Sequence, residues 1–173
     1  MYDLKQIRHE AIPSALERAH RYRLLNEPHG AESICRDIVE IEPDHQEALV
    51  TLLLALTDQF QENLGHSREE ARLVLSLIRS EYEREYYAGV ISERAAKALL
   101  HSGHAPDVVY DSVMIAMKCY ERAIPLASGD DDEAILRWNA CVRLIRRHQL
   151  ATPKPTADLV EELGSFEDEV PYR

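Results

Sequence analysis

Three arginines and one asparagine share one face of a helix that the sequence predicts near the end of the chain. The segment 133–148, EAILRWNACVRLIRRH, places its apolar residues at helical spacing. At about 100° per residue, four polar side chains gather in a sector about 100° wide; they are Asn139, Arg143, Arg146 and Arg147. Guanidinium groups bind carboxylates through paired hydrogen bonds. This face is our candidate partner-binding site. The competing interpretation is a polar outer face that keeps the last helix of a stack in water.

Patterns typical of catalysis or metal binding are missing from the sequence. There is no phosphate-binding glycine loop, no HExxH and no nucleophile elbow. His101 and His104 have no carboxylate or cysteine at ligand spacing. The run GDDDE, residues 129–133, opens a predicted helix, where the helix dipole favours acids. We therefore expect no enzymatic activity, no metal and no cofactor.

A tyrosine cluster leaves two interpretations open. Tyr82, Tyr86 and Tyr87 are spaced by one, four and five residues at the start of the helix expected at about 83–100. Packing between helices explains this spacing, and part of the cluster could also line a binding surface.

The charge and the cysteines narrow the class of partner and the compartment. The formal net charge of −11 disfavours a nucleic acid or an anionic membrane as the main partner, because both need a positive surface. Cys35, Cys119 and Cys141 are far apart in apolar helical patterns, which predicts buried, reduced thiols. The first ten residues contain no apolar core of signal-peptide length. We expect a cytoplasmic protein with a protein or peptide partner.

Prolines, glycines and capping residues divide the chain into about seven main helices. Capping boxes are predicted at Asp44–Glu47, Ser67–Glu70 and Asp130–Glu133. NEPHG (26–30) and QENLGH (61–66) are predicted to be breaks between helices. The expected helices cover about 13–25, 31–41, 44–60, 67–78, 83–100, 106–124 and 130–148.

Two segments of the chain follow one plan. The segment 30–49 can be aligned with 115–135, so that Ala31 pairs with Ala116, Cys35 with Tyr120 and Ile38 with Ala123. A small residue followed by larger apolar ones lets two helices approach closely, and the next proline or glycine forces a turn. We expect Ala31, Ala71 and Ala116 to lie at close helix crossings.

On these residues the chain resembles the tetratricopeptide repeat family. The first unit keeps the 34-residue frame of that family, and its matching residues are Tyr22, Ala31, Cys35, Ile38 and Pro43. The resemblance covers roughly residues 12–149. It implies an all-α superhelix of stacked antiparallel helical hairpins, with the first helix of each hairpin lining a concave groove. Asn139 resembles the asparagine that often holds a ligand's backbone in such grooves. Periodicity alone would also permit an irregular helical bundle.

The sequence indicates two parts. Residues 1–150 form the helical repeat domain, and residues 151–173 form an acidic tail that contains prolines. We expect the tail to dock on a helical surface, with its acids near Arg143, Arg146 or Arg147. That surface belongs either to the same chain or to a second copy, which would make a homodimer.

The leading functional hypothesis is a non-enzymatic interaction module, an adaptor that binds a peptide or helix of a partner protein in its groove. A secretion-type chaperone is a variant within this class. The alternative is an enzyme or small-anion-binding protein that uses the Asn139 and Arg143 face. A closed cavity with a histidine or an acid beside Arg143 would favour the alternative, whereas an open groove would favour the adaptor. A structural subunit that only oligomerises is a third hypothesis.

Overall fold

The computed structural model of the chain describes residues 2–151. Within this range the chain folds into seven α-helices and two short 3₁₀ helices, with no β-strand. The α-helices are α1 (Ile12–Leu24), α2 (Pro28–Ile41), α3 (Gln46–Asp58), α4 (Phe60–Leu75), α5 (Glu81–His101), α6 (Pro106–Ala123) and α7 (Glu133–His148). The 3₁₀ helices are η1 (His9–Ala11) and η2 (Ile124–Leu126). The predicted all-α class with about seven main helices is confirmed.

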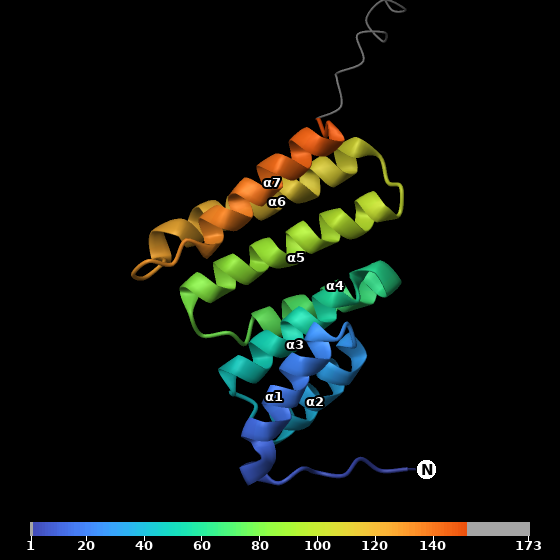
Figure 1. Cartoon of the computed structure of the whole chain (residues 1–173), viewed down its shortest axis with the longest axis vertical. Coiled ribbons are helices and arrows are strands. Elements are labelled where there is room, and N and C mark those ends of the chain that lie inside the picture. The colour runs from blue at the N-terminus through green and yellow to red at the C-terminus, as the bar shows by residue number, and fades with distance from the viewer. Residues whose placement is uncertain (1, 152–173) are drawn as a thin grey trace, which may run out of the picture.

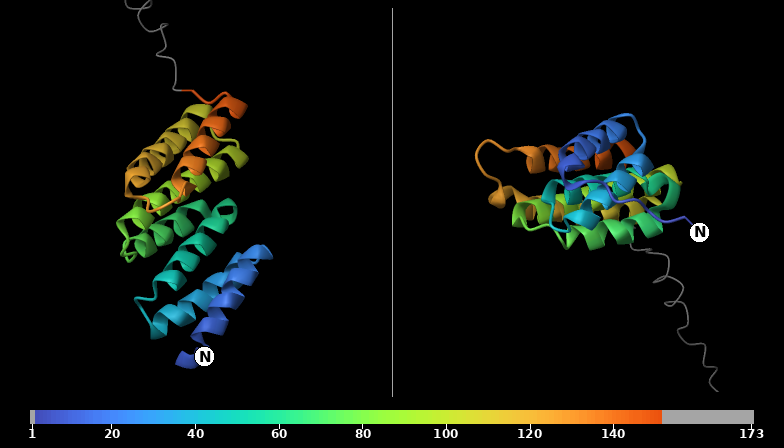
Figure 2. Two further views of the ribbon diagram at one scale, coloured as in Figure 1. Left: turned by 60° about the vertical axis from the view of Figure 1, so that its left-hand side comes forward. Right: turned by 90° about the horizontal axis from the view of Figure 1, so that it is seen from below.

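The helices stack in chain order. Each α-helix packs against the next one along the chain, and α1 also contacts α3 while α3 contacts α5. Figure 1 shows α1 and α2 at one end of the stack and α6 and α7 at the other, and Figure 2 shows the same progression from a second side. Neighbouring helices therefore form hairpin-like pairs, as the sequence predicts.

Two predicted breaks are shorter in the structure than in the prediction, because helix covers part of each. α2 begins at Pro28, a position where the missing N–H is no loss, so the turn after α1 is shorter than NEPHG. QENLGH lies within the bounds of α4, but its Asn63 has non-helical dihedral angles (φ −149°, ψ 75°), so two helical segments meet there at a kink. Phe60, Ser67 and Ala71 are all buried on α4. Ser67 and Ala71, which lie four residues apart after the kink, place one helical face on the core.

The three predicted capping boxes also need correction. At α3 the capping residue is His45, whose Nδ1 accepts a hydrogen bond from the Ala48 amide at 3.3 Å. Ser67 is buried in the interior of α4 and caps nothing. Near the start of α7 the Asp131 carboxylate accepts from the Glu133 amide at 3.0 Å. The first-turn amides of α3 and α7 still find an acceptor, but from a neighbour of the predicted residue.

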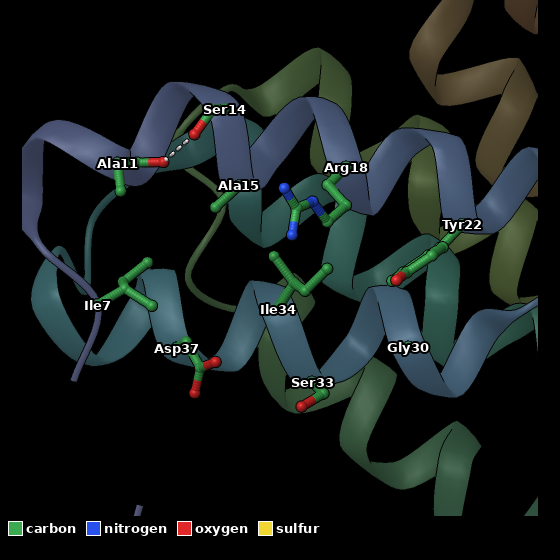
Figure 3. A pocket seen from close by; sticks show the side chains of 10 residues that line it. All are labelled: Ile7, Ala11, Ser14, Ala15, Arg18, Tyr22, Gly30, Ser33, Ile34 and Asp37. Atoms are coloured by element: carbon green, nitrogen blue, oxygen red, sulfur yellow. Dashed lines mark hydrogen bonds between the residues drawn. The ribbon is translucent and has the colours of Figure 1, made fainter. Parts of the chain in front are cut away.

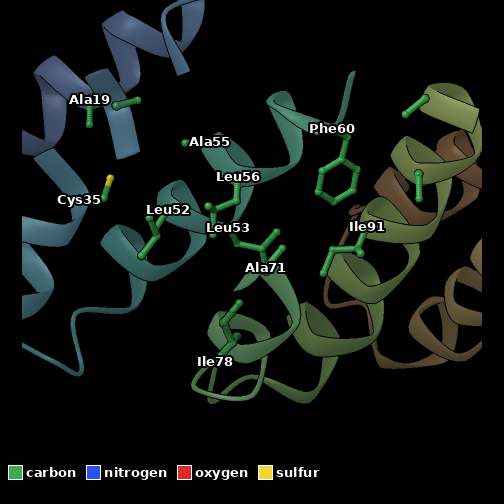
Figure 4. Close-up of a cluster of buried hydrophobic side chains, with 13 residues drawn as sticks. Ala19, Cys35, Leu52, Leu53, Ala55, Leu56, Phe60, Ala71, Ile78 and Ile91 are labelled. Atoms are coloured by element: carbon green, nitrogen blue, oxygen red, sulfur yellow. The ribbon is translucent and has the colours of Figure 1, made fainter. Parts of the chain in front are cut away.

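Small residues let the helices of the first half pack closely. Ala31 and Ala71 are fully buried, as is Ala116 in the second half. Figure 4 shows Ala19 and Cys35 on one side of the leucines of α3, with Phe60 and Ile91 on the other. α3 therefore lies at the centre of the main apolar cluster. The three alanines are buried, as a place at close helix crossings requires.

The second half is held by a buried tyrosine and a buried carboxylate. Tyr120 of α6 is fully buried, and a Cβ atom on Gly89 of α5 would lie 2.4 Å from its Cε1. The Tyr120 hydroxyl donates to Glu93 at 2.7 Å, and Glu93 is 1% exposed. Lys97 lies 2.5 Å from the same carboxylate, and Arg137 of α7 lies 3.4 Å from it. This network, which we call the Glu93 cluster, ties α5, α6 and α7 together.

The predicted burial of the cysteines is confirmed. Cys35, Cys119 and Cys141 are buried and unpaired. Burial raises the pKa of the Cys35 and Cys141 thiols to about 12, so both stay protonated at neutral pH. Among the described residues, no helix has the length and apolar character needed to cross a membrane.

Candidate functional site

The odd-numbered helices form one face of the stack. α1 contacts α3, and α3 contacts α5. α7 joins them through the Tyr86 hydroxyl of α5, which donates to Glu133 at 3.1 Å, and through Arg137, which reaches Glu93. On this face, polar side chains of different helices contact one another at several points.

An aspartate between two arginines joins three of these helices. Arg23 of α1 donates from Nε to Asp58 of α3 at 2.9 Å, and Arg94 of α5 pairs with the other oxygen of the same carboxylate. Arg94 also donates to the Thr57 hydroxyl at 2.7 Å and to the Leu54 carbonyl at 3.3 Å. We call Arg23, Asp58 and Arg94 the Asp58 cluster. Because two guanidinium groups share one carboxylate, the cluster keeps one excess positive charge.

Two hollows flank the Asp58 cluster. The larger, of about 270 Å³, lies beside α1 and is lined by His20, Arg23, Leu24, Asn26 and Asp58. The smaller, of about 170 Å³, lies beside α5 and is lined by Thr57, Asp58, Phe60, Gln61, Arg94, Lys97 and Ala98. Both present cationic groups next to apolar side chains. Since Arg23, Asp58 and Arg94 keep 21 to 23% of their side-chain surface exposed, an anionic group can reach the arginines.

A third hollow lies further along the same face. It measures about 390 Å³ and is lined by Tyr82, Glu83, Tyr86, Tyr87, Asp131 and Glu133. We call it the tyrosine pocket. Burial is the main cause that raises the pKa of all three tyrosines, with that of Tyr87 at about 12, and acidic neighbours add to the effect. The phenols therefore remain protonated at neutral pH and are uncharged donors.

The predicted binding residues lie on another side of α7. Asn139 is half-buried, and Arg143, Arg146 and Arg147 are exposed. Arg137 faces α5, where it pairs with Glu93. Asn139 follows two residues later, which rotates it by about 200° around the helix axis, so Asn139 points away from α5. Arg143, Arg146 and Arg147 share that side and make no hydrogen bond or ion pair within residues 2–151. The predicted acidic tail, whose docking on these arginines we expected, lies outside the described residues beyond Ala151.

A further groove opens at the free end of the stack. It measures about 470 Å³ and lies between α1 and α2, where Figure 3 shows Ile7 and Ile34 at one part of it and Tyr22 beside Gly30 at another. Arg18 and Asp37 bring one charge of each sign. The groove lies at the end where a preceding hairpin would stack in a longer array.

Sequence patterns within single helices missed the Asp58 cluster. Its members are 35 and 36 residues apart, and each lies on a different helix. The one available signal was Asp58 itself, an acid that ends the otherwise apolar run ALVTLLLALTD. Within residues 2–151, no three His, Cys, Asp or Glu side chains gather as a metal site would require.

Comparison with known protein families, with curated proteins and with solved structures finds no match to this chain. The functional argument therefore rests on the geometry of the face formed by α1, α3, α5 and α7.

Proposed function

We propose that this protein is a non-enzymatic interaction module that binds a segment of a partner protein along the face formed by α1, α3, α5 and α7. The observation that carries the proposal is the Asp58 cluster, in which Arg23 and Arg94 share one carboxylate between two hollows. A carboxylate of the partner segment would complete the charge balance of the two guanidinium groups.

An elongated partner suits this face better than a small molecule. The hollows beside Asp58 and the tyrosine pocket follow one another over four helices rather than merging into one enclosed cavity. Such spacing fits a chain with side chains at intervals, which is how groove-binding segments are recognised. The alternative, a small-anion site or enzyme at Asn139 and Arg143, has no specific support, because Arg143 is exposed.

Narrower assignments rest on the sequence resemblance. The hairpin stack supports a tetratricopeptide-like superhelix, in which alternate helices line the ligand groove. Three buried, unpaired cysteines support a reducing compartment, hence the cytoplasm. A secretion-type chaperone remains the variant within this class.

Random-sequence peptide display against the purified protein, followed by affinity measurement of the selected peptides, tests the proposal. We expect selected peptides to be rich in Asp and Glu. Arg94→Gln should weaken their binding by about tenfold or more, because it removes a charge that the peptide would pair with. Asp58→Asn should strengthen binding, because it frees both guanidinium groups from their shared carboxylate.

The opposite signs of these two effects separate ligand binding from damage to the fold, since misfolding would weaken binding in both variants. Lys118→Gln is the matched control, because Lys118 is exposed on α6 and its loss changes the net charge by the same amount. Equal binding by the Arg94→Gln variant and the unchanged protein would contradict the proposal.

A further inference from the structure

The tyrosine pocket has the chemistry of a cation site. Glu83, Asp131 and Glu133 bring three carboxylates to its lining, which contains no Lys, Arg or His. Arg137 interacts with Tyr86 of the lining, but it is already paired with Glu93. The pocket therefore carries a negative charge that the residues described around it do not balance.

Acids at helix starts are common, so the carboxylates alone would identify nothing. Glu83 lies in the first turn of α5 and Glu133 in the first turn of α7, where helix dipoles favour negative charge. What distinguishes this place is the aromatic lining. Tyr82 and Tyr86 stack with ring centroids 5.9 Å apart at 21°, and Tyr87 meets Tyr86 edge to face at 5.1 Å and 79°.

Three tyrosine rings give the hollow an aromatic lining. Tyrosine rings attract cations that approach a ring face to within about 6 Å of its centroid. The Tyr86 hydroxyl is held by Glu133 at 3.1 Å, which fixes that ring. Burial and the neighbouring Asp131 carboxylate both raise the pKa of the Tyr82 phenol, so this hydroxyl lies beside one of the acids of the pocket.

We propose that the tyrosine pocket binds the cationic side chain of a lysine or arginine carried by the partner segment. The inference rests on the proposed function and deepens it. A ligand cation would lie against the tyrosine rings, and the carboxylates of Glu83, Asp131 and Glu133 around the hollow would attract it. The apolar part of a lysine or arginine side chain would then cover ring surface.

The pocket and the Asp58 cluster together give the face a direction. Tyr87 lines the pocket and also lies near enough to Arg23 for that guanidinium to lower its pKa slightly against the effect of burial. The acidic end lies between α5 and α7, and the cationic end lies between α1, α3 and α5. The partner segment should therefore carry a carboxylate and a cation in a fixed order, which would specify its orientation.

Small probes test the pocket without knowledge of the partner. Nα-acetyl-lysine methylamide and its arginine counterpart are titrated into the intact protein, with amide chemical shifts as the readout. We expect saturable shifts in residues 82–87 and 131–133. The norleucine analogue, which lacks the charge, should bind about tenfold more weakly or not at all.

Two variants locate the binding. Tyr82→Leu and Glu133→Gln should each weaken the association of the lysine probe by about five- to tenfold. Tyr110→Leu is the matched control, because Tyr110 is also half-buried but lies on α6 outside the pocket. No saturable shift, equal binding of the norleucine analogue, or equal effects of the Tyr82 and Tyr110 variants would overturn the inference.

The outcomes separate this inference from the function that it deepens. If displayed peptides depend on Arg94 but not on Tyr82, the cation pocket is wrong and the proposed function stands. If the lysine probe binds and Tyr82→Leu abolishes that binding, but no displayed peptide binds, the pocket stands and the proposed function fails.

Discussion

The hairpins α1–α2 and α5–α6 use the same device in opposite order. In the first, Tyr22 on α1 lies over Gly30 on α2, and a Cβ atom on Gly30 would be 3.0 Å from its Cδ2. In the second, Gly89 on α5 lies under Tyr120 on α6, and the equivalent distance is 2.4 Å. Both pairs let two helices approach through a glycine that faces a tyrosine ring.

The difference lies in what holds each tyrosine. Tyr22 is half-buried at the rim of the end groove, so its ring can move outward. Tyr120 is fully buried, and its hydroxyl is fixed by Glu93. The comparison shows that the same glycine–tyrosine contact is adaptable at the free end of the stack and rigid where a buried charge network fixes it.

The largest effect should follow from isolating Glu93. Replacing both Lys97 and Arg137 with Met leaves the buried carboxylate with the Tyr120 hydroxyl as its hydrogen-bond donor. We expect a loss of about 3–5 kcal/mol in the free energy of unfolding, because an unpaired buried charge is costly. Urea denaturation measures it.

A third substitution checks the cause. Adding Glu93→Gln to the double variant should recover part of the loss, because a neutral amide carries no charge to leave unpaired. If the triple variant is no more stable than the double variant, lost packing by Lys97 and Arg137 explains the effect. The buried charge network would then not be what distinguishes the hairpin α5–α6 from α1–α2.

The glycine pair gives the second largest effect. Gly89→Ala should destabilise the protein by about 1–3 kcal/mol, because the buried ring of Tyr120 cannot move away from the added methyl group. Gly30→Ala should be close to neutral. The outward movement of Tyr22 is offset by the gain of about 0.5–1 kcal/mol for alanine over glycine inside a helix. Thermal unfolding of the two variants side by side measures the difference, and equal destabilisation would contradict the proposed adaptability of the free end.

The sequence predicts most of the fold because the signals are local. Apolar spacing and prolines identify seven helices, and the alanines at 31, 71 and 116 are buried as the repeat pattern requires. The errors are local as well. Polar residues and glycine predict a loop at QENLGH. The structure has only a kink there, at Asn63, and Ser67 and Ala71 hold the helix that follows against the core. Tertiary burial outweighs the low helix propensity of such a segment.

The candidate site was harder to predict because its residues meet only after folding. The periodicity of α7 alone identifies Arg143 and its neighbours, which lie exposed on the side away from α5. The Asp58 cluster joins three helices, so no pattern within one helix contains it. The tyrosine spacing was visible in the sequence, but its acidic partners Asp131 and Glu133 come from a distant segment.

The smallest effect on the free energy of unfolding should come from acid pH. It should be larger in the hairpin α5–α6 than in the hairpin α1–α2. Burial alone would raise the pKa of the Glu93 carboxyl, but hydrogen bonds from Lys97 and Tyr120 and the nearby positive charges outweigh it and hold that pKa below its ordinary value of 4.5. The pKa of Glu32 on α2 is also lowered, because hydrogen bonds from Gln59 and Arg36 outweigh its burial. A lowered carboxyl pKa stabilises the fold above pH 4.5 and loses that stabilisation as the pH falls through the folded-state value. Glu32→Gln should therefore reduce the acid dependence by at most about 1 kcal/mol, since solvent screens its ion pair. Glu93→Gln should reduce it more, because Glu93 is 1% exposed.

Urea denaturation at a series of pH values from 6 down to 3 measures the acid dependence of both variants. A larger reduction for Glu32→Gln than for Glu93→Gln would show that the buried network does not dominate the acid response.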